Sequence, residues 1–379
     1  MKFKLNYHIL VMLLITCLVF VLSVNALAQI SNDDFLKALK GLAIKSDGKP
    51  LKVGIVMSDF ISENSISLGG YPNWLLEQAG AEVTLVNANY DLRLQQNTMD
   101  DFVTMGVDVI ILQPVDDLAI AAKVNEIQAK GIPIMCINHP PTDKDGNPIV
   151  AVGGISPNVK MAIGCANYII EKAAGKDVKV AEIIGDINQI LAQQRTAAFK
   201  EAIGKHANIK YVNSRVTNWG PEDADKATED FITADPDLFA IFIEGDCMAS
   251  GVIAALKRNG KLYPVGDPKH IMIVSIDGAP YGLQTIREGW LDLSMEQSSY
   301  AMASIPIKGA LMVAQGIKLP EIGKGVIAVE PVKITAENVD SETLWGNYGV
   351  PHNEVWPDTL KVWEQYRFAG DEAILNRFK

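Results

Sequence analysis

The sequence predicts an α/β protein with two domains, each built on a doubly wound parallel sheet. From residue 50 onward, short apolar runs alternate with amphipathic stretches of helical length, as in βαβ units. A polar, turn-rich stretch at residues 139–148 interrupts this alternation, which then restarts, so we expect the domain boundary there. The length of 379 residues also suits two or three domains.

The chain begins with the pattern of a secretory signal peptide. Lys2 and Lys4 precede an apolar run at residues 9–22, which is short for a membrane span. The segment Ala26-Leu27-Ala28 has the small residues of a cleavage site, so cleavage is expected after Ala28. An uncleaved membrane anchor is the alternative interpretation, and a lipoprotein is a weaker one.

The composition excludes several classes of protein. Lys and Arg number 34 and Asp and Glu 45, so the net charge is −11 and binding of nucleic acid by charge attraction is not expected. After cleavage three cysteines remain, Cys136, Cys165 and Cys247, which allow at most one disulfide. We interpret them as buried thiols.

The apolar runs are the expected strands. Most are rich in β-branched residues and apolar at every position, as strands covered on both faces must be. They are residues 53–57, 83–86, 109–112, 132–137, 180–184, 238–243, 271–276 and 291–295. Helices are expected between them, among others at residues 118–130, 159–174, 190–206 and 248–259.

Polar side chains follow most of these runs, as Asp59, Asn138, Asp246 and Asp277 illustrate. Taken singly, each could simply mark the start of a solvated loop. In open parallel sheets, however, ligands bind outside the carboxyl ends of the strands. Carboxylates and amides from two facing sheets would form a cleft suited to a small polyhydroxylated ligand.

Five segments carry a family resemblance. They are GVDVIILQPVD at residues 106–116, KGIPI at 130–134, EGDCMASG at 244–251, SIDGAP at 275–280 and REG at 287–289. In this order and spacing they resemble motifs of periplasmic sugar-binding proteins of the ribose-binding type, the type I substrate-binding proteins of ABC importers. The resemblance covers roughly residues 52–340 and implies two doubly wound parallel-sheet domains joined by a hinge.

The resemblance also implies domain limits and a ligand-binding cleft. The limits are a signal peptide at 1–28, an N-terminal extension at 29–51, a first lobe at 52–149 and 298–325, a second lobe at 150–297 and 326–340, and a C-terminal extension at 341–379. The first-lobe wall would hold Ser58, Asp59, Phe60, Asn138 and His139. The second-lobe wall would hold Arg195, Trp219, Asp246 and Asp277, with Gln297 at a crossing between the lobes.

Two departures from the family pattern prevent the transfer of a named sugar. Asn138-His139 stands where the family often has Asp-Arg, and Gly245 stands where it has Asn. His139 has no second His or Cys nearby in sequence, so a hydrogen-bonding role is expected rather than a metal site. Structural roles remain open for the other wall residues, since Asp246 and Asp277 could each cap the helix that follows.

The function implied is capture of a sugar or polyol by hinge closure, followed by delivery to the membrane permease subunits of an ABC importer. The resemblance implies a periplasmic monomer without a cofactor, and a chemoreceptor is a further candidate partner. One alternative is a protein that binds a small signalling molecule for a receptor; a hydrolase built on Asp59 or His139 is less supported. A transcriptional repressor of the same fold would need a basic helix-turn-helix before Lys52, where the signal peptide stands instead.

The two ends of the chain extend beyond the resemblance. A short helix is expected after Asp33 as its cap, and an amphipathic helix near residues 357–368. Trp345, Trp356 and Trp363 in the C-terminal extension are expected to pack onto a domain face.

Overall fold

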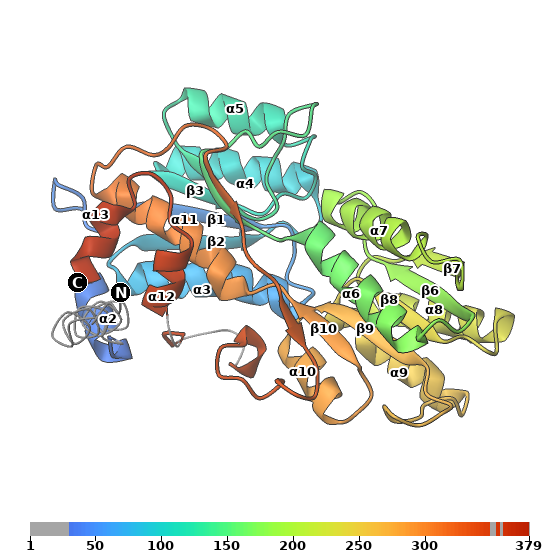
Figure 1. The fold of residues 1–379 in the computed structure, drawn as a ribbon. Coiled ribbons are helices and arrows are strands. Elements are labelled where there is room, and N and C mark those ends of the chain that lie inside the picture. Colours follow the sequence, from blue (N-terminus) through green and yellow to red (C-terminus); the bar gives the residue numbers. More distant parts are fainter. Residues whose placement is uncertain (1–29, 349–353, 357–358, 379) are drawn as a thin grey trace, which may run out of the picture.

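The computed structural model describes residues 30–348, 354–356 and 359–378. The expected signal peptide and its cleavage site lie outside the described residues. Two six-stranded sheets stand in two separate lobes, which Figure 1 shows side by side. Among the helices in the described ranges, none combines the length and apolarity needed to cross a membrane.

The first sheet has the strand order β11-β5-β4-β3-β1-β2, with every neighbouring pair parallel. Its strands are β1 (Lys52–Met57), β2 (Glu82–Asn87), β3 (Val109–Leu112), β4 (Ile134–Asn138), β5 (Val152–Ile155) and β11 (Gly325–Ala328). Helices α3 (Glu63–Gln78) and α11 (Ser299–Ala314) cover one face, and α4 (Leu92–Met105) and α5 (Ala121–Ala129) cover the other.

The second sheet has the order β12-β10-β9-β8-β6-β7. Its strands are β6 (Val178–Ile184), β7 (Ile209–Val216), β8 (Ala240–Ile243), β9 (Met272–Asp277), β10 (Leu293–Glu296) and β12 (Val332–Ile334). Helices α6 (Asn158–Ala173) and α7 (Ile190–Ile203) cover one face. The 3₁₀ helix η1 (Asp246–Met248) and helices α8 (Pro221–Ala234), α9 (Ala249–Arg258) and α10 (Pro280–Arg287) cover the other. All pairs are parallel except the edge pair β10–β12, which is antiparallel, so the predicted parallel sheets are confirmed with that exception.

The central strands are buried on both faces, as their apolar runs predict. In β1, Ile55 and Met57 enter the cluster beneath α3 and α11, whereas Val56 between them enters the cluster beneath α4 and α5. Successive side chains of a strand point to opposite faces, so a strand between two helical layers must be apolar throughout.

The expected boundary between the lobes is wrong by one strand. Residues 139–148 fold back on themselves: Thr142 pairs with Pro148, and the Asp143 carboxylate accepts the backbone N–H of Asn147 at 2.9 Å. The chain therefore returns to the first lobe, where β5 pairs with β4, and crosses only after Ser156. The limit at residues 325 and 326 is also wrong, because β11 pairs with β5 along its whole length.

Strand β5 escaped the sequence analysis because two of its four residues are glycine. A Cβ on Gly154 would come within 2.0 Å of the backbone oxygen of Met302, and one on Gly153 within 2.0 Å of Cys136 Sγ. Gly154 therefore lets α11 lie directly against the strand, and Gly153 leaves room for Cys136 of β4. Both glycines also remove the apolar pattern by which a buried strand is predicted.

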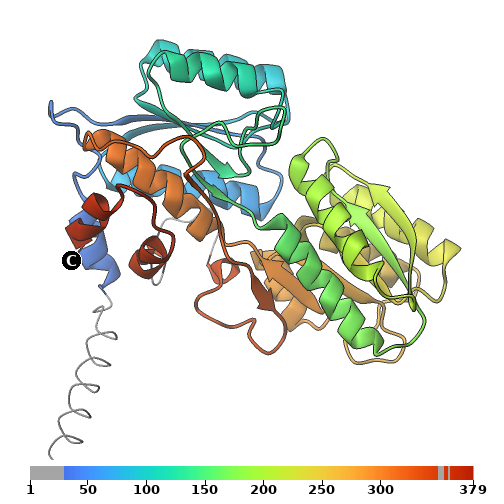
Figure 2. The same ribbon diagram turned by 45° about the horizontal axis from the view of Figure 1, so that its top comes forward.

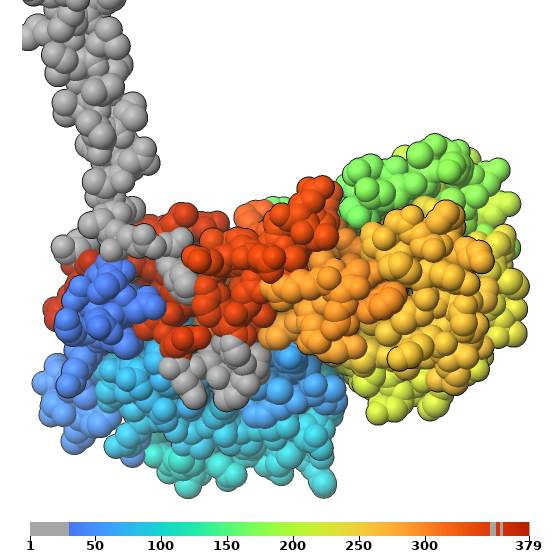
Figure 3. Space-filling view, turned by 90° about the horizontal axis from the view of Figure 1, so that it is seen from below, coloured from blue at the N-terminus to red at the C-terminus, as the bar shows by residue number. Residues whose placement is uncertain are grey.

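The C-terminal extension packs across the molecule, as its three tryptophans predict. The 3₁₀ helix η2 (Trp345–Asn347) lies against α10 in the second lobe, while α12 (Thr359–Gln365) and α13 (Glu372–Leu375) lie against α11 in the first. Figure 2 shows α13 beside α2 (Asn32–Leu39), and Figure 3 shows this red segment reaching from the blue N-terminal helix toward the orange second lobe. The cap of α2 is Ser31 rather than the expected Asp33, since the Ser31 side chain accepts from the backbone N–H of Asp34.

A buried ion pair fixes the end of this extension. Lys308 of α11 and Asp371 are both fully buried, and the Lys308 Nζ to Asp371 Oδ2 distance is 2.6 Å. The same ammonium group donates to the backbone carbonyls of Trp363 and Tyr366 at 2.9 and 2.7 Å. All three ammonium protons are thus used by groups of the extension, as burial of such a charge requires.

Candidate functional site

The carboxyl ends of the two sheets face each other and enclose a polar cavity between the lobes. Its volume is about 40 Å³. Its lining residues come from both lobes: Asp59, Ser62, Asn64, Ser65, Tyr90, Gln113, Asn138, Gln189, Leu191, Arg195, Trp219, Cys247, Asp277 and Gln297.

The backbone around this cavity is strained in several places. In the described part of the chain, six residues other than glycine have a positive φ, and four of them line the cavity. These four are Tyr90 (58°), Asn138 (71°), Trp219 (61°) and Asp277 (125°). Such conformations cost on the order of 1–3 kcal/mol each and persist where the surrounding structure holds them for a function.

Arg195 is the central cation of the second-lobe wall. It lies on α7, is 2% exposed, and donates from Nε to Asn158 Oδ1 at 2.9 Å and from Nη1 to the Glu244 carbonyl at 2.5 Å. Its Nη2 donates to Gln297 Oε1 at 3.2 Å. Burial lowers the pKa of Arg195, while the nearby Asp277 carboxylate opposes that shift.

Asp277 and Gln297 complete the hydrogen-bond chain. Gln297 Nε2 donates to Asp277 Oδ1, so the Gln297 amide joins Arg195 to Asp277 through its two ends. The other carboxylate oxygen of Asp277 accepts the backbone N–H of Asp246 at 3.2 Å. Burial raises the pKa of Asp277, and the Arg195 charge acts against it.

Trp219 forms the aromatic part of this wall. Its Nε1 donates to Gln189 Oε1 at 3.1 Å, and its ring centroid lies 5.8 Å from the Arg195 guanidinium carbon. A Cβ on Gly185 would come within 2.1 Å of the indole, so glycine is required there for the ring to take this position.

The first-lobe wall presents acceptors. Asp59 follows β1 and accepts hydrogen bonds from the hydroxyls of Ser58 (2.9 Å) and Ser65 (2.8 Å). Gln113 Oε1 and Asn138 Oδ1 are buried and have no hydrogen-bond partner among the described residues. Buried polar atoms normally have partners, so these two acceptors are suited to receive donors from a ligand.

The ten predicted site residues therefore fall into two groups. Six of them, Asp59, Asn138, Arg195, Trp219, Asp277 and Gln297, line the cavity. Four do not: Ser58, Phe60, His139 and Asp246. Ser58 supports Asp59, Phe60 packs against the first-lobe core, and His139 borders a neighbouring groove.

Asp246 lies behind the second-lobe wall instead of on it. Its carboxylate is fully buried, accepts the backbone N–H of Ala279 at 2.8 Å and the Ser294 hydroxyl at 3.0 and 3.1 Å. Asp246 does not cap the helix that follows it, since neither η1 nor α9 has a side-chain cap; its carboxylate instead holds the loop that carries Asp277 and leads into α10. Direct contact with a ligand, the role expected from the resemblance, is not available to it in this arrangement.

Several lining residues were missed. Gln113 directly follows the apolar run of β3, and this polar strand end was the available signal. Tyr90, Asn64 and Gln189 lie on loops or a helix start where sequence alone gives no such position. Cys247 also lines the cavity, so the interpretation of all three cysteines as buried thiols holds for Cys136 and Cys165 but only in part for Cys247, although all three are free.

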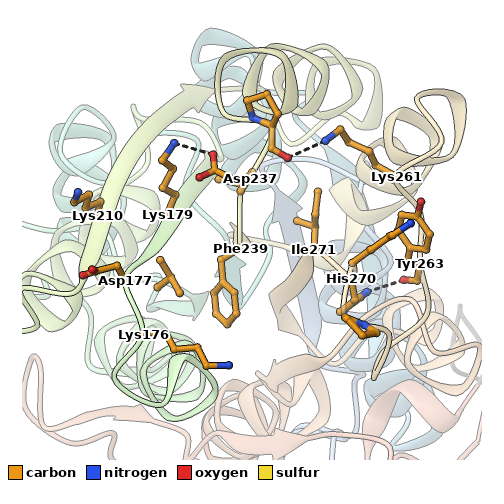
Figure 4. A pocket seen from close by; sticks show the side chains of 15 residues that line it. Lys176, Asp177, Lys179, Lys210, Asp237, Phe239, Lys261, Tyr263, His270 and Ile271 are labelled. Carbon is orange, nitrogen blue, oxygen red and sulfur yellow. Dashed lines mark hydrogen bonds and ion pairs between the residues drawn. The ribbon is translucent and has the colours of Figure 1, made fainter.

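A larger hollow of about 720 Å³ lies at the opposite, amino end of the second sheet. Figure 4 shows lysines around it, with Lys179 bound to Asp237; Lys261 Nζ donates to the Pro236 carbonyl. This hollow is confined to one lobe and lacks the buried, unpartnered acceptors of the cleft. Within the described ranges, no group of three His, Cys, Asp or Glu side chains is placed to hold a metal ion.

Comparison with known proteins agrees with this architecture. Residues 73–318 match the family model of the periplasmic binding protein domain. This chain belongs to the periplasmic binding protein family. The family's type I fold, predicted from the five motifs, is confirmed.

Members of the family that resemble this chain include two curated relatives. The ribose import binding protein RbsB of Bacillus subtilis is 24% identical over 285 residues, covering 75% of this chain and 88% of its own. The xylitol-binding protein of Mycolicibacterium smegmatis is 24% identical over 302 residues, covering 79% and 80%.

A solved structure of the family shows the same fold. It is the binding protein of the arabinose ABC transporter from Shewanella sp. ANA-3, bound to α- and β-L-arabinofuranose. The TM-score is 0.69 at 22% identity, over 86% of this chain and 98% of that one.

Proposed function

We propose that this protein captures a sugar or polyol between its two lobes and delivers it to the membrane permease of an ABC importer. The observation that carries the proposal is the meeting, in one cleft, of the Arg195–Gln297–Asp277 chain with the unpartnered acceptors of Gln113 and Asn138. Vicinal hydroxyls donate and accept at adjacent positions, so one polyhydroxylated ligand can engage both walls.

The small size of the cavity supports a closing motion. The cavity between the walls is small, about 40 Å³, and a motion in which the lobes part to admit a ligand and close around it accounts for this. Chain crossings after Ser156, Gln297 and Val329 connect the lobes and can act as the hinge, and the C-terminal extension also contacts both lobes. A ligand that contacts both walls stabilises the closed state because it binds that state more tightly.

The relatives support the ligand class. Two are named for ribose and xylitol, and the third is bound to L-arabinofuranose; all three compounds are small and polyhydroxylated. We further propose that cleavage after Ala28 releases the protein into the periplasm, where it binds its ligand without chemical turnover.

The experiment is a thermal-shift panel on residues 29–379, unfolded and refolded to remove carried ligand. Pentoses, hexoses, polyols and sugar acids are each added in excess. A ligand at about 100 times its Kd stabilises the fold by ~2.7 kcal/mol, which shifts Tm by several degrees.

The matched variants are Asp277→Asn, which should lose the shift, and Asp230→Asn on the exposed face of α8, which should keep it. A panel without any shift, or consumption of the compound that gives one, would count against the proposal. The N-terminal residue of the secreted protein, measured by mass spectrometry, tests the cleavage site.

A further inference from the structure

A second cavity between the lobes adjoins the proposed binding cleft. It measures about 650 Å³ and shares Asn138 with the cleft cavity. We call it the His139 groove; it is lined by the β3–α5 turn, the β4–β5 loop, the start of α6 and the β6–α7 loop. Residues of both lobes therefore form it, and its volume lies within the roughly 300–1,000 Å³ of small-molecule sites.

Hydrogen bonds connect the groove to the cleft. The Ser156 hydroxyl, on the groove, donates to Gln297 Oε1 at 2.6 Å. Asn158, also on the groove, accepts from Arg195 and donates from Nδ2 to Gln194 Oε1 at 3.1 Å. The same network thus borders both cavities, and a ligand held by Arg195 or Gln297 lies beside the groove.

The buried His139–Asp117 pair gives the groove its polar centre. His139 is 2% exposed, and its Nδ1 is hydrogen-bonded to Asp117 Oδ1. The other oxygen of Asp117 accepts the backbone N–H of Ile190 at 3.3 Å, so this carboxylate also joins the two lobes. His139 Nε2 is buried and has no partner among the described residues.

This arrangement favours a ligand that donates hydrogen bonds. With Nδ1–H donated to Asp117, the neutral imidazole keeps Nε2 as an acceptor, and Asn138 Oδ1 is a second unpartnered acceptor. Three aspartates and one lysine line the groove, which disfavours an anionic ligand. Hydroxyl groups of a neutral carbohydrate match these acceptors.

We propose that the ligand is a neutral glycoside of at least two units, with one unit in the cleft and the second in the His139 groove. This rests on the proposed function and extends it, because a single sugar ring engaged by the cleft would leave the 650 Å³ groove and the His139 acceptor unused. Ile187 and Ile190 supply apolar surface for the C–H face of the second unit.

The test is calorimetric titration of the refolded protein with maltose, cellobiose, lactose, trehalose and sucrose, each beside its component monosaccharides. At least one disaccharide should bind about tenfold or more tightly than its components, a gain of ~1.4 kcal/mol. Ile187→Trp fills the groove from a position that is 40% exposed and should bring this ratio close to one. The matched control is Val216→Trp, at the edge strand β7, which is also exposed and lines neither cavity.

The outcomes separate the two proposals. Monosaccharides that bind while no disaccharide binds more tightly would overturn the glycoside and leave the proposed function standing. A disaccharide preference that Ile187→Trp does not reduce would overturn the placement of the second unit. If no saccharide of either kind binds, both proposals are wrong.

Discussion

The indole Nε1 of Trp345 donates a 2.7 Å hydrogen bond to the backbone carbonyl of Asp277. Trp345 belongs to the C-terminal extension and Asp277 to the second-lobe wall of the cleft, so the extension contacts a cavity-lining residue that has a strained conformation (φ 125°). The backbone N–H of Trp345 also donates to Glu296 Oε1 at 3.0 Å. The extension is thus part of the support of the site.

Trp345→Phe should therefore lower the stability of the fold by about 0.5–1.5 kcal/mol, because the Asp277 carbonyl loses its indole donor and keeps only the 3.2 Å hydrogen bond from the backbone N–H of Gln297. Trp363→Phe is the matched control: its ring is equally buried, but its Nε1 has no partner in the described structure. Urea denaturation of both variants checks this. Equal losses at the two positions would show that packing, not the hydrogen bond, is what Trp345 contributes.

Lys308→Ala should cost about 3–5 kcal/mol, because the buried Asp371 would lose its close cation and keep only the longer 3.6 Å pair with Arg367. Removing both charges in Lys308→Met with Asp371→Leu should cost less than the single change. Lys160→Ala, which breaks an exposed pair with Glu330 (both 61% exposed), should cost at most about 1 kcal/mol. Similar effects of Lys308→Ala and Lys160→Ala in chemical denaturation would contradict the anchoring role of the buried pair.

Glu296 should make the fold less stable as pH rises. Burial raises its pKa to about 7, whereas in the unfolded chain it is about 4.3. The folded state therefore holds the proton more tightly, and this contribution is complete below about pH 4 and is lost as pH rises through about 7.

Glu296→Gln keeps the side-chain oxygen that accepts from Trp345 and removes the titration. The unmodified protein should lose stability between about pH 5 and pH 8, and the variant should not. The unfolding free energy of the variant minus that of the unmodified protein should therefore increase across this range by on the order of 2 kcal/mol. The measurement is the difference in unfolding free energy between the two proteins at each pH. A difference that does not change with pH would place the pKa of Glu296 in its ordinary range.

Arg195→Ala should weaken ligand binding by about tenfold to a hundredfold, the effect of losing a charged hydrogen bond of about 1.5–3 kcal/mol. It also leaves the Glu244 carbonyl without its donor and removes one of the two donors to Asn158 Oδ1, so stability must be measured beside affinity. Arg215→Ala, on an exposed arginine paired with Asp230, is the control and should bind normally. Unchanged affinity in a folded Arg195→Ala protein would remove Arg195 from the site.

The sequence predicted the fold best where burial determines which residue types occur in a strand. Runs such as Val109–Leu112 are apolar at every position because helices cover both faces, and that pattern predicts the two parallel sheets. It failed for β5, whose glycines make room for α11 and Cys136, and for residues 139–148, whose turn-forming residues build a loop within one lobe. Glycines that allow two backbones to approach closely form no apolar or periodic pattern in the sequence, so such a strand is not predicted from it.

The cleft was predicted in part for a similar reason. Residues that end a strand, such as Asp277 and Asn138, have a position that topology fixes. Asp246 also follows a strand, yet its side chain turns behind the wall to Ala279 and Ser294, and only the side-chain geometry distinguishes these two cases. Tyr90 reaches the cavity from a turn with positive φ that the sequence does not mark.

The most direct test of the account is the distance between the lobes with and without ligand. Spin labels are placed at Lys130→Cys, at the end of α5, and at Lys257→Cys on α9. The distance between the two labels is then measured by pulsed electron paramagnetic resonance. Cys136 and Cys165 are buried, and the labels are introduced in a Cys247→Ser background because Cys247 lines the cavity. The account predicts a broad or longer distribution for the stripped protein, which contracts to a single shorter distance when the sugar identified by thermal shift is added. A distribution that stays unchanged while that sugar is bound would contradict capture by closure of the two walls.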